Sequence, residues 1–110
     1  MTVSEAIAIA RALRPNELEE QVLRHLLLEL DHRIALETGK ARMGEPCEGT
    51  PVYRETLGVL APFDRVYWTY LVAMIDMALG HTEAYGISHA LFTEARDAYL
   101  RWVQRGEGSR

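Results

Sequence analysis

Two histidines and a glutamate in the first third of the sequence have the types and spacing of metal ligands. His25, Glu29 and His32 fall at i, i+4 and i+7, and Glu29 with His32 forms the E-x-x-H pair of di-metal sites in helical bundles. Such a site needs a second E-x-x-H, but His81 and His89 have no glutamate three positions earlier. We therefore assign no metal to these residues and interpret them as the polar face of a solvated helix.

One carboxylate, Asp76, lies inside the apolar stretch of residues 73–78. An aspartate in such a setting is either an acid–base group with a raised pKa or half of a structural ion pair. Arg33 lies in an equally apolar stretch, and no histidine or nucleophile is evidently associated with Asp76. We therefore predict a structural ion pair between Arg33 and Asp76.

The common catalytic signatures are missing from the sequence. It has no glycine-rich phosphate loop, no H-E-x-x-H, no G-x-S-x-G and no paired C-x-x-C. Its one cysteine, Cys47, has no cationic neighbour that would favour a reactive thiolate, so we interpret it as a free surface thiol. We expect no catalytic residue, no metal and no cofactor, and hence no enzymatic activity.

The composition is typical of one globular domain made in the cytoplasm. The chain has 110 residues, of which 48% are hydrophobic and 25% charged. Its net charge of −4 disfavours a protein that holds nucleic acid by the phosphates, and a single cysteine cannot form an internal disulfide. No apolar run approaches the roughly 18–20 residues that span a bilayer, and the N-terminus does not resemble a signal peptide. We therefore expect no membrane association.

Hydrophobic periodicity predicts an all-α fold, a small four-helix bundle-like domain over residues 1–105. Thr2 and Glu5 have the spacing of a capping box before the first helix, Pro62 is expected as the first residue of the third, and Thr82 as the cap of the fourth. In the second helix a stripe recurs every fourth residue, and Leu23 and Leu27 widen it; its other members are Leu18, Val22, Leu26, Leu30 and Ile34. The expected helices are residues 3–13, 16–38, 62–79 and 82–105.

Between the second and third helices the pattern breaks over residues 39–61, which are rich in glycine and proline. Two β-favouring pairs in this long irregular loop, Val52-Tyr53 and Val59-Leu60, have the composition of a brief hairpin. An insert of this length is usually functional or disordered. Residues 106–110 are polar, and we expect them to form a flexible C-terminal tail.

Large aromatic residues indicate that the chain has an interface. Tyr67, Trp68 and Tyr70 cannot all point the same way on one helix, and we expect Trp68 to face away from the local core as an interface anchor. The insert and the tail are the natural elements to reach neighbouring proteins. The interface candidates are Trp68, Tyr53, Arg105 and Arg110.

An ordered set of motifs along the chain resembles the small head–tail connector (adaptor) proteins of long-tailed bacteriophages and prophages. Residues 28–34 are similar to the family's L-x-E-L-D-x-R-I segment, and residues 67–76 to its Y-x-x-Y-L-x-x-x-I-D segment. No single motif is diagnostic, but together they cover nearly the whole chain in the right order, apart from residues 40–50. The remaining matches are residues 4–8, 13–16, 55–64 and 90–98, with Trp102.

The resemblance implies a helical subunit of a ring in the virion neck, commonly of twelve copies, made in the cytoplasm of a bacterial host. It implies that this ring docks beneath the portal protein, extends the DNA channel and receives the head-closure or tail-completion protein. DNA would pass through the channel without specific binding, and the family has no enzymatic activity and no cofactor. A ring subunit needs two complementary faces, which wide apolar helix stripes and outward aromatic residues would supply.

Two other classes of protein remain as alternatives. A small helical DNA-binding regulator or a small terminase subunit would need a helix that gathers basic residues on one side. The densest basic set is Arg96, Arg101, Arg105 and Arg110, and it is diluted by acidic neighbours. A helical metal carrier or bundle enzyme would need the second ligand set that the sequence lacks.

Overall fold

The computed structural model describes residues 1–40 and 55–106, which form four α-helices and no β-strand. The predicted all-α fold of four helices is therefore confirmed, whereas residues 41–54 of the predicted loop lie outside the described residues. The helices are α1 (Val3–Leu13), α2 (Glu20–Glu37), α3 (Arg65–Ala78) and α4 (Thr82–Gln104).

Helix α1 forms where its capping signals predict it. The Thr2 hydroxyl accepts a hydrogen bond from the Glu5 N–H at 3.1 Å, and the Glu5 carboxylate accepts one from the Thr2 N–H at 2.8 Å. This reciprocal capping box satisfies two N–H groups that have no partner inside the helix. The helix ends at Leu13 because Arg14, directly before Pro15, leaves the helical conformation.

Helix α2 begins four residues later than predicted. The Asn16 side chain accepts a hydrogen bond from the Leu18 N–H at 3.0 Å, so it forms a local turn that competes with the helix. Four members of the predicted stripe are buried, namely Leu23, Leu27, Leu30 and Ile34, but Val22 is 48% exposed and does not belong to the core face. A spacing of four drifts by about 40° at each step, so five such residues cannot stay on one face of the helix. The buried residues of α2 are Leu23, Leu27, Leu28, Leu30, Asp31 and Ile34.

Helix α3 begins at Arg65, so Pro62 is not its first residue. Pro62 follows a cis peptide bond in a turn, in which the Phe63 N–H donates to the Leu60 carbonyl at 3.0 Å. At the other end Gly80, at a φ of +74°, closes the helix. The His81 N–H donates to the Asp76 carbonyl at 2.9 Å, which is the 6→1 bond of a Schellman motif. Helix α4 then starts at Thr82, with His81 rather than Thr82 in the capping position.

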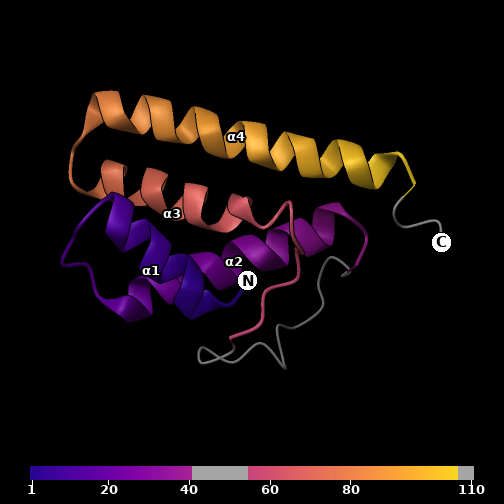
Figure 1. The fold of residues 1–110 in the computed structure, drawn as a ribbon, viewed down its shortest axis with the longest axis horizontal. Helices are drawn as coiled ribbons and strands as arrows, with labels where there is room; N and C mark the ends of the chain where they lie inside the picture. Colours follow the sequence, from indigo (N-terminus) through magenta and orange to yellow (C-terminus); the bar gives the residue numbers. More distant parts are fainter. Residues whose placement is uncertain (41–54, 107–110) are drawn as a thin grey trace.

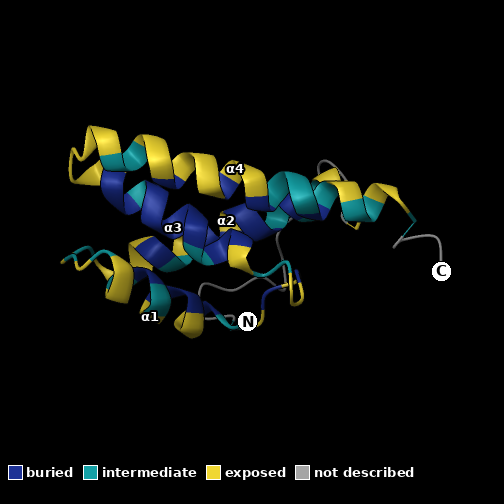
Figure 2. Cartoon of the chain, turned by 45° about the horizontal axis from the view of Figure 1, so that its top comes forward, coloured by how far each residue is buried: buried dark blue, intermediate teal, exposed yellow. Residues whose placement is uncertain are grey.

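Helix α3 is the centre of the molecule (Figure 1). Helix α4 folds back antiparallel on one side of α3, while α1 and α2 lie on the other. Among the described helices, α3 is the only one whose backbone packs closely against α4. Figure 2 shows the consequence, because α3 is almost wholly buried whereas much of α4 is exposed.

The described end of the long insert is held against the N-terminus rather than paired in a hairpin. The Val3 N–H donates to the Glu55 carbonyl at 2.7 Å, and Thr2 and Thr56 form an isolated antiparallel bridge. Val59-Leu60, one half of the predicted hairpin, is not a strand, and the other half, Val52-Tyr53, lies outside the described residues. Within the described ranges, no helix has the length and apolar character to cross a membrane.

Candidate assembly surfaces

The buried carboxylate Asp76 is paired with Arg14, so the predicted partner Arg33 is wrong. The Arg14 Nε donates to Asp76 Oδ1 at 2.6 Å, the Ser88 hydroxyl donates to Oδ2 at 2.9 Å, and His81 Nδ1 lies 3.6 Å away. Burial raises the pKa of Asp76, but the hydrogen bonds from Arg14 and Ser88 outweigh it and hold the pKa below its ordinary value. The carboxylate therefore joins α3 to the end of α1 and to α4 as a structural anion.

Arg33 is on the surface, beside the other half of α3. Its guanidinium lies 5.9 Å from the centre of the Tyr70 ring, as in a cation–π contact. Tyr70 precedes Asp76 by six residues, so the two side chains lie more than one helical turn apart. No carboxylate among the described residues forms an ion pair with Arg33.

A second buried network, which sequence reasoning missed, holds the end of the insert. The Tyr67 hydroxyl donates to Asp31 Oδ1 at 2.6 Å and accepts from the Val59 N–H at 2.7 Å, while the Gly58 N–H donates to the same Asp31 oxygen at 3.1 Å. Burial, followed by the nearby Asp31 charge, raises the pKa of Tyr67, so its hydroxyl remains protonated and able to donate. Asp31, Gly58 and Tyr67 come from three segments that are far apart in the sequence, which is why periodicity alone did not reveal this network.

A third network fastens the insert to α1 and α2 on the surface. The Arg24 guanidinium binds the carboxylates of Glu55 and Glu20, and it also donates to the Ser4 hydroxyl. Hydrogen bonds from Ser4 and then from Arg24 lower the pKa of Glu55. The position of the insert's end relative to α1 is therefore fixed by charge as well as by backbone pairing.

The candidate metal ligands lie on the surface of α2. His25 Nε2 is 3.9 Å from the Glu29 carboxylate, and both side chains are mostly exposed. In residues 1–40 and 55–106, no group of three or more histidine, cysteine, aspartate or glutamate side chains is arranged to hold a metal ion. The interpretation of this trio as a polar helix face agrees with its exposure.

Helix α4 carries an exposed apolar strip on the flank that no other described helix covers. Ile87 is 67% exposed and Leu91 is 41% exposed, one helical turn apart. Glu83 and Glu94, which are also exposed, continue the same strip at its two ends. We call Glu83, Ile87, Leu91 and Glu94 the α4 strip.

A groove lies on the opposite flank of α4, between α4 and the C-terminal half of α2. Its volume is about 490 Å³, and the ion pair between Glu37 and Arg96 joins the two helices there. Apolar and basic side chains together line this groove. The residues that define this α2–α4 groove are Leu30, Leu36, Phe92, Arg33, His89 and Arg96.

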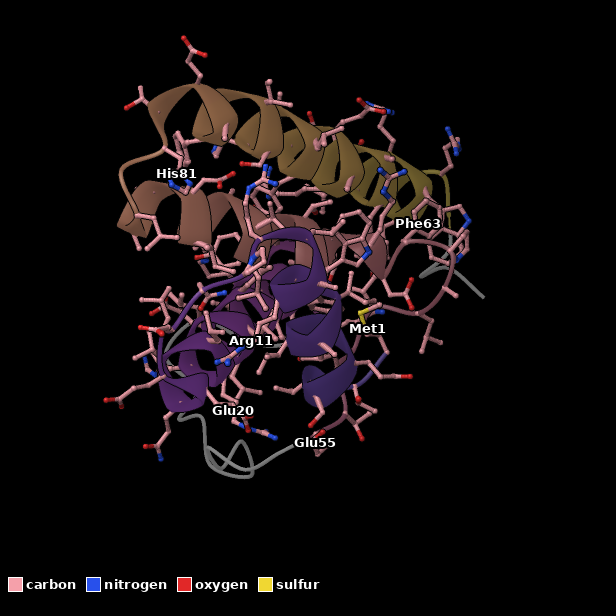
Figure 3. All side chains as sticks on the ribbon, turned by 60° about the vertical axis from the view of Figure 1, so that its left-hand side comes forward. Met1, Arg11, Glu20, Glu55, Phe63 and His81 are labelled. Carbon is pink, nitrogen blue, oxygen red and sulfur yellow. The ribbon has the colours of Figure 1, made fainter. Side chains whose placement is uncertain are left out.

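A smaller apolar cleft of about 380 Å³ lies where the insert meets the far end of α4. Phe63 contacts both Tyr99 and Trp102, with ring centres 5.6 and 5.1 Å apart, respectively. Leu60, at the edge of this cleft, is 72% exposed. Phe63 and His81 mark the opposite ends of α3 in Figure 3, so this cleft is remote from the Asp76 network.

The structure places only two of the four sequence-predicted interface residues. Trp68 is the least buried of Tyr67, Trp68 and Tyr70, as expected, but it is only half-exposed and packs partly against the core. Arg105 is exposed at the end of α4. Tyr53 and Arg110 lie outside the described residues, and an interface role for each of the four residues stays a prediction. Cys47, which we interpret as a free surface thiol, also lies outside the described residues.

Comparison with known proteins adds no relative to this picture. No protein-family model, no curated protein and no solved structure matches the chain. The features that bear on function are therefore a helix attached on one side, apolar surfaces on its two flanks, and buried networks that fix the helices relative to one another.

Proposed function

We propose that the chain is a structural head–tail connector (adaptor) subunit of a long-tailed bacteriophage or prophage. In this role, copies form a ring, commonly of twelve, beneath the portal protein in the virion neck. The ring extends the DNA channel and receives the head-closure or tail-completion protein. The subunit is made in the cytoplasm of the bacterial host and carries out no reaction.

The observation that carries this proposal is the one-sided attachment of α4. Because α3 is the one described helix whose backbone packs closely on α4, Ile87 and Leu91 are left in contact with water, and exposed apolar strips are typical of surfaces that bind other proteins. The resemblance of the ordered motifs to connector proteins supplies the kind of assembly. Internal networks around Asp76 and Asp31 support it as well, since a ring subunit must hold its faces in a fixed relation.

The charge of the chain supports a conduit rather than a DNA-binding regulator. A net charge of −4 gives little attraction to phosphates, so DNA can slide past without being held. The basic set on α4 is also partly neutralised, because Arg96 pairs with Glu37 and lies 3.7 Å from Asp97. A recognition helix would instead present its basic side chains unpaired to the groove of DNA.

We expect that removal of the gene for this chain from its parent element blocks the joining of heads and tails. After induction, electron microscopy of the lysate should show DNA-filled heads and separate tails, and a plasmid copy of the gene should restore joined particles. The control is a nonsense mutation in a tail-fibre gene, which leaves heads and tails joined. Normal particles without this chain, or changed transcription with normal particles, would contradict the proposal and favour a regulator.

A further inference from the structure

The α4 strip and the α2–α4 groove lie on nearly opposite sides of the same helix. Ile87 of the strip and His89 beside the groove are two positions apart, and so are Glu94 of the strip and Arg96 of the groove. With 3.6 residues per turn, positions two apart point about 160° away from each other. The molecule therefore presents two different surfaces on its two flanks.

The two surfaces are complementary in both polarity and charge. The strip offers two exposed apolar side chains, Ile87 and Leu91, between two carboxylates, and no described cation forms an ion pair with Glu83 or Glu94. The groove offers apolar side chains beside Arg33, which also has no carboxylate partner in the described ranges. In the described part of the chain, the strip thus supplies carboxylates without a cation, and the groove supplies an arginine without a carboxylate.

We infer that the α4 strip of one copy of this chain docks in the α2–α4 groove of the next copy. Ile87 and Leu91 pack against the apolar residues of the groove, and a carboxylate at one end of the strip faces Arg33. This inference rests on the proposed function, because it names the contact that builds the ring. A contact between two different surfaces of one chain is heterologous, and it closes into a ring when the rotation between copies allows it.

Pairing of two strips with each other is disfavoured. In an antiparallel pair of α4 helices that contact through the strip, Glu83 of one copy would approach Glu94 of the other. Like charges brought together in an interface repel each other, which weakens such a pairing. The charge pattern therefore selects the head-to-tail contact over a symmetric dimer.

Two variants and their mixture test this contact. The strip variant carries Ile87→Ser and Leu91→Ser. The groove variant carries Arg33→Glu and Thr93→Glu, since Thr93 also lines the groove, and all four positions are exposed. Thermal unfolding followed by circular dichroism should confirm that both variants are as stable as the wild type. Sedimentation equilibrium over a wide concentration range then gives the mass of each sample.

We expect the mass of the wild type to rise with concentration. Each variant alone should associate at least about a hundredfold more weakly than the wild type. An equal mixture should stop at a heterodimer, since the intact groove of one variant accepts the intact strip of the other. A wild type that is monomeric at every concentration overturns the inference. So does a mixture that remains monomeric, or variants that associate as the wild type does, because the contact then lies elsewhere.

These outcomes are separate from the test of the proposed function. A wild type that joins heads to tails but fails the sedimentation test retains its connector role and loses only this contact. A chain that self-associates through the strip and the groove, but is dispensable for joined particles, retains the contact and loses the connector role.

Discussion

Substitution Arg14→Ala is expected to lower the free energy of unfolding by about 3 kcal/mol, because it leaves a buried carboxylate without its cation. The Asp76 side chain is 0% exposed, and Arg14 makes its shortest hydrogen bond. The matched control is Arg33→Ala, which removes an exposed arginine that contacts the Tyr70 ring but has no ion pair among the described residues, and which should cost less than about 1 kcal/mol. Urea unfolding of the three proteins measures both values.

A double-mutant cycle separates this ion pair from other effects of the two residues. If Arg14 and Asp76 act together, the variant with both Arg14→Met and Asp76→Leu should lose less stability than the sum of the losses measured for Arg14→Met alone and Asp76→Leu alone. Equal losses for Arg14→Ala and Arg33→Ala, or strictly additive single changes, would contradict the network around Asp76.

The same carboxylate is expected to make stability depend on pH. Because the pKa of Asp76 is lower in the folded chain than in the unfolded one, its contribution is present above the ordinary aspartate value and is lost as the pH falls toward the folded value. The pKa of Glu55 is lowered too and acts in the same direction. The difference between the stability curves of the wild type and Asp76→Asn isolates the Asp76 part.

Substitution Tyr67→Phe is expected to lower the free energy of unfolding by about 2 kcal/mol, because it leaves the buried Val59 N–H without a partner and removes one of the hydrogen bonds to the Asp31 carboxylate. The lost hydroxyl donates to Asp31 and accepts from the Val59 N–H, and both residues are buried. The control is Tyr85→Phe, which removes a half-buried hydroxyl with no hydrogen bond in the described part of the chain and should cost at most about 0.5 kcal/mol.

Amide hydrogen exchange distinguishes the loss of this network from a general loosening. In Tyr67→Phe the N–H groups of Gly58 and Val59 should exchange faster relative to the α3 amides. Uniform acceleration across the chain, or an unchanged rate at Val59, would contradict the role of Tyr67 in holding the end of the insert.

The parts of the fold that the sequence predicts well are those fixed by residues close together in the sequence. The capping box of Thr2 and Glu5 acts within three positions, so the bounds of α1 are confirmed at both ends. The start of α2 depends on whether Asn16 caps a helix or forms its own turn, and both options use the same side chain. Pro62 is equally compatible with a first helical turn and with the turn that precedes α3.

The site was harder to predict because its residues meet only in the folded chain. Arg33 and Arg14 are both arginines near apolar residues, and the choice between them depends on where α1 ends relative to α3. The Asp31–Tyr67 contact spans 36 positions, so no local pattern reveals it. The exposure of Leu91 likewise depends on the tertiary fold, because α3 is the one described helix whose backbone packs closely on α4.

The most direct test of a connector role is a complex with the portal protein encoded in the same genome. The two proteins are co-expressed, purified through a tag on the portal and averaged in electron micrographs, with the portal alone as the control. We expect a second coaxial ring below the portal that is absent from the control. A bare portal ring with this chain eluting separately, or a chain recovered on duplex DNA instead, would contradict the account.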